Sequence, residues 1–163
     1  MRDALGGIVN IQMIIVFLVL INGYLAFSVN YTKAFRVKNK IITAIEQYEG
    51  NVEAASEING DLYCYIVGSC EDKPGVGYHP TNYRCPAGFT DAPNQLGFCY
   101  QERNVGEDTT DTHSGVTSTL EKKQYRVVTF VTIDIPIVRF IIERVNPFNI
   151  KGDTKTIYKR KES

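Results

Sequence analysis

The sequence is poor in the residue types that build catalytic and metal-binding sites. It contains only two histidines, His79 and His113, and neither stands in an H-x-x-x-H or H-x-E pattern, which excludes zinc sites of the zincin and deaminase types. The nucleophile elbow G-x-S-x-G and the glycine-rich phosphate loops of nucleotide-binding proteins are also absent. We therefore predict a protein that is not an enzyme and that has no cofactor, no metal and no catalytic residue.

The chain lacks a net charge, and one long stretch lacks charge altogether. Its 18 basic and 18 acidic residues leave no basic excess of the kind that nucleic-acid binding requires. Residues 4–32 carry no charged side chain, and within them residues 8–29 are almost entirely aliphatic or aromatic. Since about 20 apolar residues in a helix cross the ~30 Å hydrocarbon core of a bilayer, this run predicts a transmembrane helix.

Proline is absent from the first 73 residues, and the helical pattern continues beyond the apolar run. The next apolar residues recur at spacings of three and four and form one stripe on an amphipathic helix: Ala34, Phe35, Ile41, Ile42, Ile45 and Tyr48. Glu49-Gly50-Asn51 provides a stop, with glycine where a left-handed turn is needed. The pattern predicts one helix of roughly 60 Å over residues 8–49.

These features divide the chain into three parts: a leader and transmembrane helix (1–30), an amphipathic extension (31–50) and a β-rich ectodomain (51–163). A cleaved signal peptide is the alternative for the first part, with Ala26-Phe27-Ser28 as a tolerable cleavage site. The apolar core of a signal peptide has about 7–15 residues, whereas this run has about 20 and its periodicity continues through that site. We therefore expect an anchor that is not cleaved.

The four cysteines, Cys64, Cys70, Cys85 and Cys99, lie within one short stretch after the apolar run. Their spacing lacks the C-x2–4-C knuckles of structural zinc sites, and in a membrane-targeted chain it favours two disulfides in an oxidising compartment. Cys64–Cys70 with Cys85–Cys99 closes the two smaller loops, although all three connectivities are compatible with the sequence. In each of the three connectivities Cys85 is disulfide-bonded, which disfavours a catalytic thiol–base pair of Cys85 with His113.

The orientation in the membrane receives opposing signals. Lys33, Arg36, Lys38 and Lys40 follow the apolar run, and the positive-inside rule would place this side in the cytoplasm. The clustered cysteines favour the outside, so we expect a cytoplasmic N-terminus and an extracytoplasmic C-terminal domain. The basic residues then either contact anionic lipid headgroups or form a solvated helix face.

The remaining chain predicts a small antiparallel sheet with one short helix, capped by Asn51, over residues 51–58. Expected strands cover residues 61–67, 97–103 and 125–135, with 137–145 as a second strand or a bent continuation, and a closing hairpin over 148–151 and 154–158. Residues 104–119 are polar and predict a mobile surface loop or a hairpin excursion between strands. Glu107, Asp108 and Asp111 in this segment lack EF-hand spacing, which favours a solvated acidic loop over a calcium site.

The resulting fold class is α+β. A long N-terminal transmembrane helix continues into an amphipathic helix, which packs on a small antiparallel β-sheet with disulfide-stapled loops.

Small and polar residues inside the apolar run indicate contacts with other helices. Asn22, Gly23, Ala26 and Asn30 share one helix face, where small residues allow close approach and amides can bond across an interface. Simple tolerance of mildly polar residues is the alternative. We predict that the run packs with transmembrane helices of the same or related subunits.

This layout resembles the type IV pilin-like subunits, and most closely the TadE-like minor pilins (pseudopilins) of tight-adherence systems. The similar parts are the apolar run, its continuation FSVNYTKAFRVKNKIITAIEQYEG and the C-terminal VTFVTIDIPIVRFIIERV with the last hairpin. The resemblance implies processing by a prepilin peptidase after a small residue such as Gly7. It also implies a glutamate at the fifth mature position, where this chain has Gln12.

The resemblance implies a non-enzymatic, membrane-anchored subunit of a homo- or hetero-oligomeric assembly, acting in pilus or secretion-system assembly or in surface adhesion. Two alternatives stay open on the sequence. One is a single-span receptor or adhesin whose 104–119 segment binds a ligand, and the other is a cytoplasm-facing accessory subunit of a membrane complex.

Overall fold

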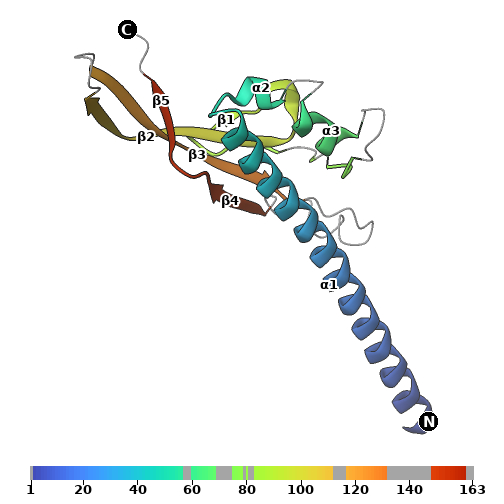
Figure 1. Cartoon of the computed structure of the whole chain (residues 1–163). Coiled ribbons are helices and arrows are strands. Elements are labelled where there is room, and N and C mark those ends of the chain that lie inside the picture. The colour runs from blue at the N-terminus through green and yellow to red at the C-terminus, as the bar shows by residue number, and fades with distance from the viewer. Residues whose placement is uncertain are drawn as a thin grey trace.

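The computed structural model of the chain describes residues 2–56, 60–68, 75–78, 80, 83–111, 117–131 and 148–160. Over these residues the fold is α+β, with one long helix laid against an antiparallel sheet (Figure 1). The described elements, in chain order, are α1 (Arg2–Gln47), α2 (Val52–Ser56), α3 (Asp61–Val67), β1 (Thr90–Asp91), the 3-10 turn η1 (Pro93–Gln95), β2 (Phe98–Asp111), β3 (Thr117–Phe130), β4 (Asn149–Asp153) and β5 (Ile157–Arg160). The predicted α+β class, with a long N-terminal helix packed on an antiparallel sheet, is thereby confirmed.

Helix α1 is continuous over 46 residues, which confirms the prediction that one helix runs from the apolar run into the domain. Its N-terminal half projects away from the sheet, and every side chain from Gly7 to Asn22 is exposed. Its C-terminal half carries the predicted stripe, of which Ala34, Ile41 and Ile45 are fully buried against the domain. The same helix therefore has a free half and a packed half.

The end of α1 follows the predicted stop. Glu49 and Gly50 have φ angles of 50° and 80°, and the Gly50 N–H donates to the carbonyl of Ile45 at 2.8 Å. A Cβ atom on Gly50 would lie 2.6 Å from the ring of Tyr125, so the helix end sits directly on strand β3. Asn51 then caps α2, since its Oδ1 accepts the N–H of Ala54 at 3.1 Å.

The sheet has the order β1-β2-β3-β4, and all its pairs are antiparallel. Strand β3 is its centre, because β5 also pairs with β3, at residues 120–123, beyond the part of β3 that β4 occupies. The prediction that residues 148–151 and 154–158 form a closing hairpin is therefore wrong. The two strands lie end to end along β3, and the Thr154 N–H and Oγ1 bridge between them by bonding the backbone of Tyr125.

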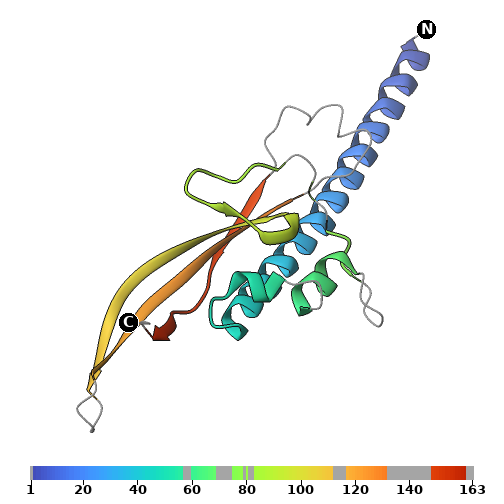
Figure 2. The same cartoon turned by 90° about the horizontal axis from the view of Figure 1, so that it is seen from above.

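The two faces of β3 contact different layers. Tyr125, Val127 and Val131 point to the α1 side and join its core, as the predicted alternation requires. Val128 and Phe130 point to the other side, where they pack with Cys99 and the loop residues Tyr83 and Phe89. Near residues 127–131 the sheet is thus covered on both faces, by α1 and by the disulfide-linked loop (Figure 2).

Residues 61–67 form helix α3, which corrects the prediction of a strand. A seven-residue apolar run fits either period, and local propensity yields to the tertiary surroundings. Leu62 and Ile66, one turn apart, are fully buried in the core beside α1. Gly68, in the left-handed conformation at φ 74°, ends the helix by donating its N–H to the Cys64 carbonyl.

For residues 104–119 the sequence predicts either a mobile loop or a hairpin between strands. Where the structure describes them, they form the hairpin. Residues 98–111 of β2 pair with residues 117–129 of β3, with a bulge between Asn104 and Gly106 that leaves Val105 exposed. The hairpin extends well beyond the end of α1 (Figure 2). Other predictions, namely those on Cys70, His79, His113 and residues 132–147, lie outside the described residues.

Replacing Gly50 by alanine is expected to lower the unfolding free energy by roughly 2–4 kcal/mol, because a Cβ at φ 80° strains the backbone and displaces the Tyr125 ring. Gly77→Ala is the matched control, since Gly77 also has a positive φ of 62° but open space around its Cβ position. Its loss should be about 1 kcal/mol. Denaturant unfolding of the full chain in detergent micelles, followed by circular dichroism, measures both losses; equal losses would contradict the contact with Tyr125.

Candidate membrane-proximal site

The exposed half of α1 is the first unusual surface of the molecule. It is strongly apolar, and every side chain from Gly7 to Asn22 is exposed. By length and composition it is the one helix of the described chain that could cross a membrane. An exposed apolar surface of this extent is typical of sites that contact a membrane or another protein.

The predicted helix-packing residues lie where this exposed half meets the domain. Asn22 is exposed, and its Nδ2 donates to the Leu18 carbonyl at 2.7 Å, so this amide is partly satisfied within its own helix. Gly23, Ala26 and Asn30 are half-buried and continue, at spacings of three and four, into the stripe that begins at Ala34. The chain's own domain therefore partly covers this face.

Gly23 is the open position of that face. No heavy atom lies within 4 Å of the place that its Cβ would occupy. Gly7 is equally open, and Gln12 is exposed near the start of α1. These two predicted processing residues thus lie on the free half of the helix.

An aromatic cluster, formed by Phe27, Tyr31 and Phe148, lies where the domain meets the exposed half of α1. The ring centroids of Phe27 and Phe148 are 5.9 Å apart in a T-shaped arrangement, and those of Phe27 and Tyr31 are 6.1 Å apart. Phe148, just before β4, is 52% exposed, so the domain presents an aromatic edge at this level. Tyrosine is typical of the boundary between membrane and water, and phenylalanine of the apolar interior, so this cluster has the composition expected at the inner edge of that boundary.

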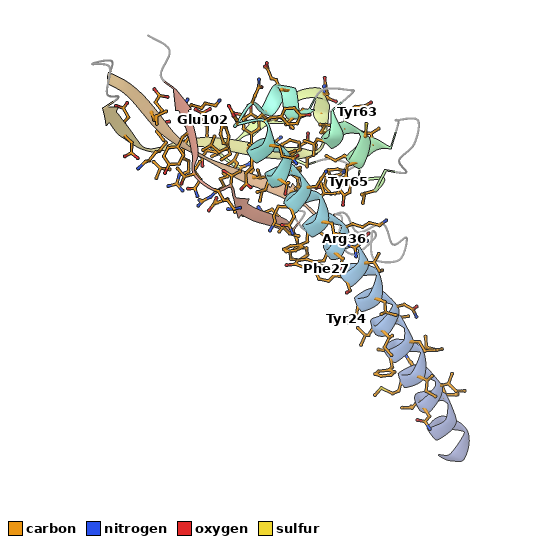
Figure 3. All side chains as sticks on the ribbon, in the orientation of Figure 1. Tyr24, Phe27, Arg36, Tyr63, Tyr65 and Glu102 are labelled. Carbon is orange, nitrogen blue, oxygen red and sulfur yellow. A yellow bond between two sulfur atoms is a disulfide. The ribbon has the colours of Figure 1, made fainter. Side chains whose placement is uncertain are left out.

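A groove of about 370 Å³ opens at the same level of α1. One wall comes from α1 and the other from α3 and the segment that follows it. Its lining residues are Ser28, Val29, Thr32, Lys33 and Arg36 on α1, with Tyr65 and Val76 opposite. Figure 3 shows Arg36 and Tyr65 next to each other, with Phe27 further along α1 toward its N-terminus.

The basic residues that follow the apolar run take three different environments. Lys33 and Arg36 line the groove, and the Lys40 ammonium lies 6.0 Å from the Tyr65 ring centroid. Lys38 is instead 9% exposed on the sheet side, with its ammonium 4.2 Å from the Phe35 ring centroid. Lys33 and Arg36 are exposed, so a solvated face still describes these two residues, whereas it does not describe the buried Lys38.

The disulfide Cys85–Cys99 is present, which confirms one of the two predicted pairs. Cys64 is also disulfide-bonded, and its predicted partner Cys70 lies outside the described residues. Asp91 lies near the Cys85 and Cys99 sulfurs, the only such group of potential metal ligands among the described residues. Sulfurs joined in a disulfide supply no thiolate, so this group does not provide a thiolate zinc site.

The hydroxyl of Tyr78 ties the segment after α3 to the sheet. It accepts the Phe130 N–H at 2.7 Å and donates to the Phe130 carbonyl at 2.9 Å, as a neighbouring strand would. Burial raises the pKa of this hydroxyl well above its usual range. The Val76 N–H donates to the Tyr65 carbonyl at 2.9 Å, so the same segment also holds the groove wall in place.

Charges on the projecting hairpin are paired across strands. The Lys122 ammonium lies 2.6 Å from Asp108, and the Lys123 ammonium lies 2.6 Å from Glu102. The Arg126 guanidinium holds Asp153 with two bonds of 2.6 and 3.0 Å and lowers the pKa of that carboxyl. Asp108 therefore forms an ion pair with Lys122, which agrees with the predicted solvated acidic segment.

Comparison of the chain with protein-family models, with curated proteins and with solved structures finds no match.

Sequence reasoning missed the groove and the aromatic cluster. Tyr65 and Phe148 come from segments remote from the apolar run, and only the packing of the domain brings them to its end. Tyr78 was missed as well, since its position between Gly77 and His79 resembles an ordinary loop. A tyrosine in a glycine-rich loop was the only available signal.

Tyr78→Phe is expected to lower the unfolding free energy by about 1–3 kcal/mol, because it leaves the buried Phe130 backbone groups without the hydroxyl. Tyr48→Phe, which removes an exposed hydroxyl at the end of α1, should change the unfolding free energy by less than about 0.5 kcal/mol. Denaturant titration of the full chain measures both, and a Tyr78→Phe loss no larger than that of the control would contradict the role of this hydroxyl.

Alkaline pH should weaken the fold through Tyr83. Burial, together with its 2.7 Å hydrogen bond to Asp91, raises the pKa of Tyr83 to about 12, above the value of about 10 in the unfolded chain. The protonated form is thus favoured by folding, and its contribution is complete below pH ~10 and lost as the pH rises to about 12. Tyr83→Phe should flatten part of this decline in melting temperature; an unchanged slope would contradict the assignment.

Proposed function

We propose that the protein is a non-enzymatic, membrane-anchored, TadE-like pilin-type subunit that acts in pilus or secretion-system assembly or in surface adhesion. The observation that supports this best is the division of α1. One continuous helix is fully exposed and apolar over residues 7–22 and buried against its own sheet from Ala34 onward.

In this proposal the exposed half of α1 anchors the protein in the membrane, and the packed half supports the β-rich domain. The packed half needs no partner, because its stripe is buried by the chain's own sheet. The free half needs a cover, and the apolar run that contains most of it, residues 8–29, is about 33 Å long as a helix, close to the ~30 Å hydrocarbon core of a bilayer. A continuous helix transmits the position of the domain to the anchored half without a flexible joint.

The anchor is also the proposed assembly element. Other transmembrane helices, from copies of this chain or related subunits, would pack on its exposed half, and Gly23 offers the close approach that such packing requires. Gln12 stands where pilin-like subunits carry a glutamate. It can exchange hydrogen bonds with a neighbouring subunit, but it carries no charge to neutralise an N-terminal amine.

The proposed orientation places the N-terminus in the cytoplasm and the domain outside. The Cys85–Cys99 disulfide supports it, since disulfides persist in oxidising compartments. Thiol labelling of intact cells with and without reductant tests it. Labelling that requires cell lysis but no reductant would favour the cytoplasm-facing accessory subunit instead.

The projecting β2–β3 hairpin favours a second candidate, a single-span receptor or adhesin. It carries exposed Val105 at a bulge far from the anchor, where a ligand could contact it. Recovery of the protein in sheared filament fractions supports the pilin-type subunit, while its retention in the membrane fraction supports the adhesin.

Gly23→Leu is expected to reduce crosslinking between anchors about tenfold, because a leucine side chain prevents close helix approach. The domain should keep its melting temperature, since no atom lies near the Gly23 Cβ position. Leu25→Phe, two residues along and so on nearly the opposite face, adds bulk as a control and should leave crosslinking unchanged. Unchanged crosslinking of Gly23→Leu would contradict assembly through this face.

A further inference from the structure

The groove between α1 and α3 combines positive charge with hydroxyl groups. Lys33 and Arg36 supply the charge, and Ser28 and Thr32 lie one turn below them on the same wall. None of the lining residues is acidic, and no acidic side chain in the described part of the chain pairs with Lys33 or Arg36. This combination is suited to a phosphate group.

Two built features keep the groove open. Tyr65 and Val76 form its far wall, and the hydrogen bond from the Val76 N–H to the Tyr65 carbonyl joins them. Tyr78, two residues on, anchors the same segment to the sheet through Phe130. Tyr65 and Val76 are partly buried and pack against the domain core, so the far wall is attached to that core.

The height of the groove along α1 indicates where its ligand lies. Lys33 and Arg36 follow the last residue of the apolar run, Val29, by four and seven residues, which places their Cα atoms roughly 6 and 10 Å beyond it. The headgroup region of one leaflet is about 5–8 Å thick. Helix side chains lean toward the N-terminus, so the two cationic groups reach down into this region.

The aromatic cluster lies at the end of the apolar run, nearer the N-terminus of α1 than the two cationic residues. Phe27, Tyr31 and Phe148 lie beside the end of the apolar run, and Phe27 is nine residues, or half a turn around the helix, from Arg36. One side of α1 thus presents aromatic rings at the boundary while the opposite side presents the basic groove (Figure 3). Along the helix axis Phe27 lies roughly 9 Å before Lys33 and roughly 14 Å before Arg36. The rings therefore mark the end of the apolar run and the cations lie beyond it, in the order expected where a helix leaves the hydrocarbon core.

We propose that this groove binds the phosphate headgroup of an anionic phospholipid. This inference rests on the proposed membrane anchoring, because the apolar half of α1 is what holds the groove at the headgroup. Lys33 and Arg36 contact the phosphate oxygens, and Ser28 donates a hydrogen bond at the glycerol level. The Thr32 hydroxyl donates to the Ser28 carbonyl at 2.8 Å and accepts a hydrogen bond there. The lipid would fix the rotation of α1 about its axis and so the direction in which the hairpin projects.

The test compares lipid binding by the full chain and by variants in detergent micelles, measured by native mass spectrometry with phosphatidylglycerol and phosphatidylcholine. The wild type should retain phosphatidylglycerol at least tenfold more tightly than phosphatidylcholine. Lys33→Gln with Arg36→Gln should lose this preference, whereas the charge-preserving pair Lys33→Arg with Arg36→Lys should keep most of it. Lys151→Gln with Lys155→Gln removes the same charge from exposed sites outside the groove and should change nothing.

Three results would overturn the assignment. One is an equal loss of preference in the groove variant and in the Lys151/Lys155 control, which would indicate nonspecific charge attraction. Another is equal retention of both lipids by the wild type. The third is displacement of phosphatidylglycerol by an equal concentration of inorganic phosphate, which would indicate a site for free phosphate.

Incorporation of the full chain into phosphatidylcholine vesicles separates this inference from the proposed function. A chain that fails to incorporate overturns the membrane anchoring and the lipid site together. A chain that incorporates but shows no preference for anionic lipid overturns the groove assignment alone.

Discussion

The packing of the C-terminal half of α1 on strand β3 is the contact on which the rest of the structure depends. Ala34, Ile41 and Ile45 are buried against the face of β3 that carries Tyr125 and Val127. Each large aliphatic side chain contributes roughly 1.5–3 kcal/mol on burial, and the short helices α2 and α3 are too short to persist without this core. The Thr129 hydroxyl, which donates to the Ala34 carbonyl at 3.2 Å, adds a polar tie within the same contact.

This contact also positions everything at the boundary of the apolar run. Helix α1 is continuous through Gln47. The position along α1 at which the sheet packs therefore determines which α1 residues lie beside Tyr65 and Phe148. Sliding the helix by one turn would move it about 5.4 Å and separate Arg36 from the groove wall. The Lys155 N–H, which donates to Glu46 at 2.8 Å, and the contact of Gly50 with Tyr125 set the upper end of this register.

The two faces of the sheet are covered by hydrophobic clusters of different size. The α1 face holds the large core, while the opposite face is closed by a small cluster around Cys99, Val128 and Phe130, over which the Cys85 disulfide holds the Tyr83 loop. The hairpin beyond these layers has no cover and relies on cross-strand ion pairs such as Lys122–Asp108, each worth little at an exposed site. It is thus the part of the described chain that has the weakest support and lies far from the exposed half of α1 (Figure 1).

The sequence alone predicts the long helix, its apolar half, its stop at Gly50 and the alternation of β3. These follow from local rules, namely hydrophobic periodicity and a glycine at a left-handed position. The cysteine spacing favours the Cys85–Cys99 pair but is compatible with three connectivities, and the tertiary structure decides among them. Tertiary structure alone decided that residues 61–67 form a helix, since Leu62 and Ile66 gain burial beside α1 only in that form. It also decided that β4 and β5 pair with β3, and that Tyr65, Val76 and Phe148 meet the end of the apolar run. These are contacts between residues far apart in the chain, which no local pattern encodes.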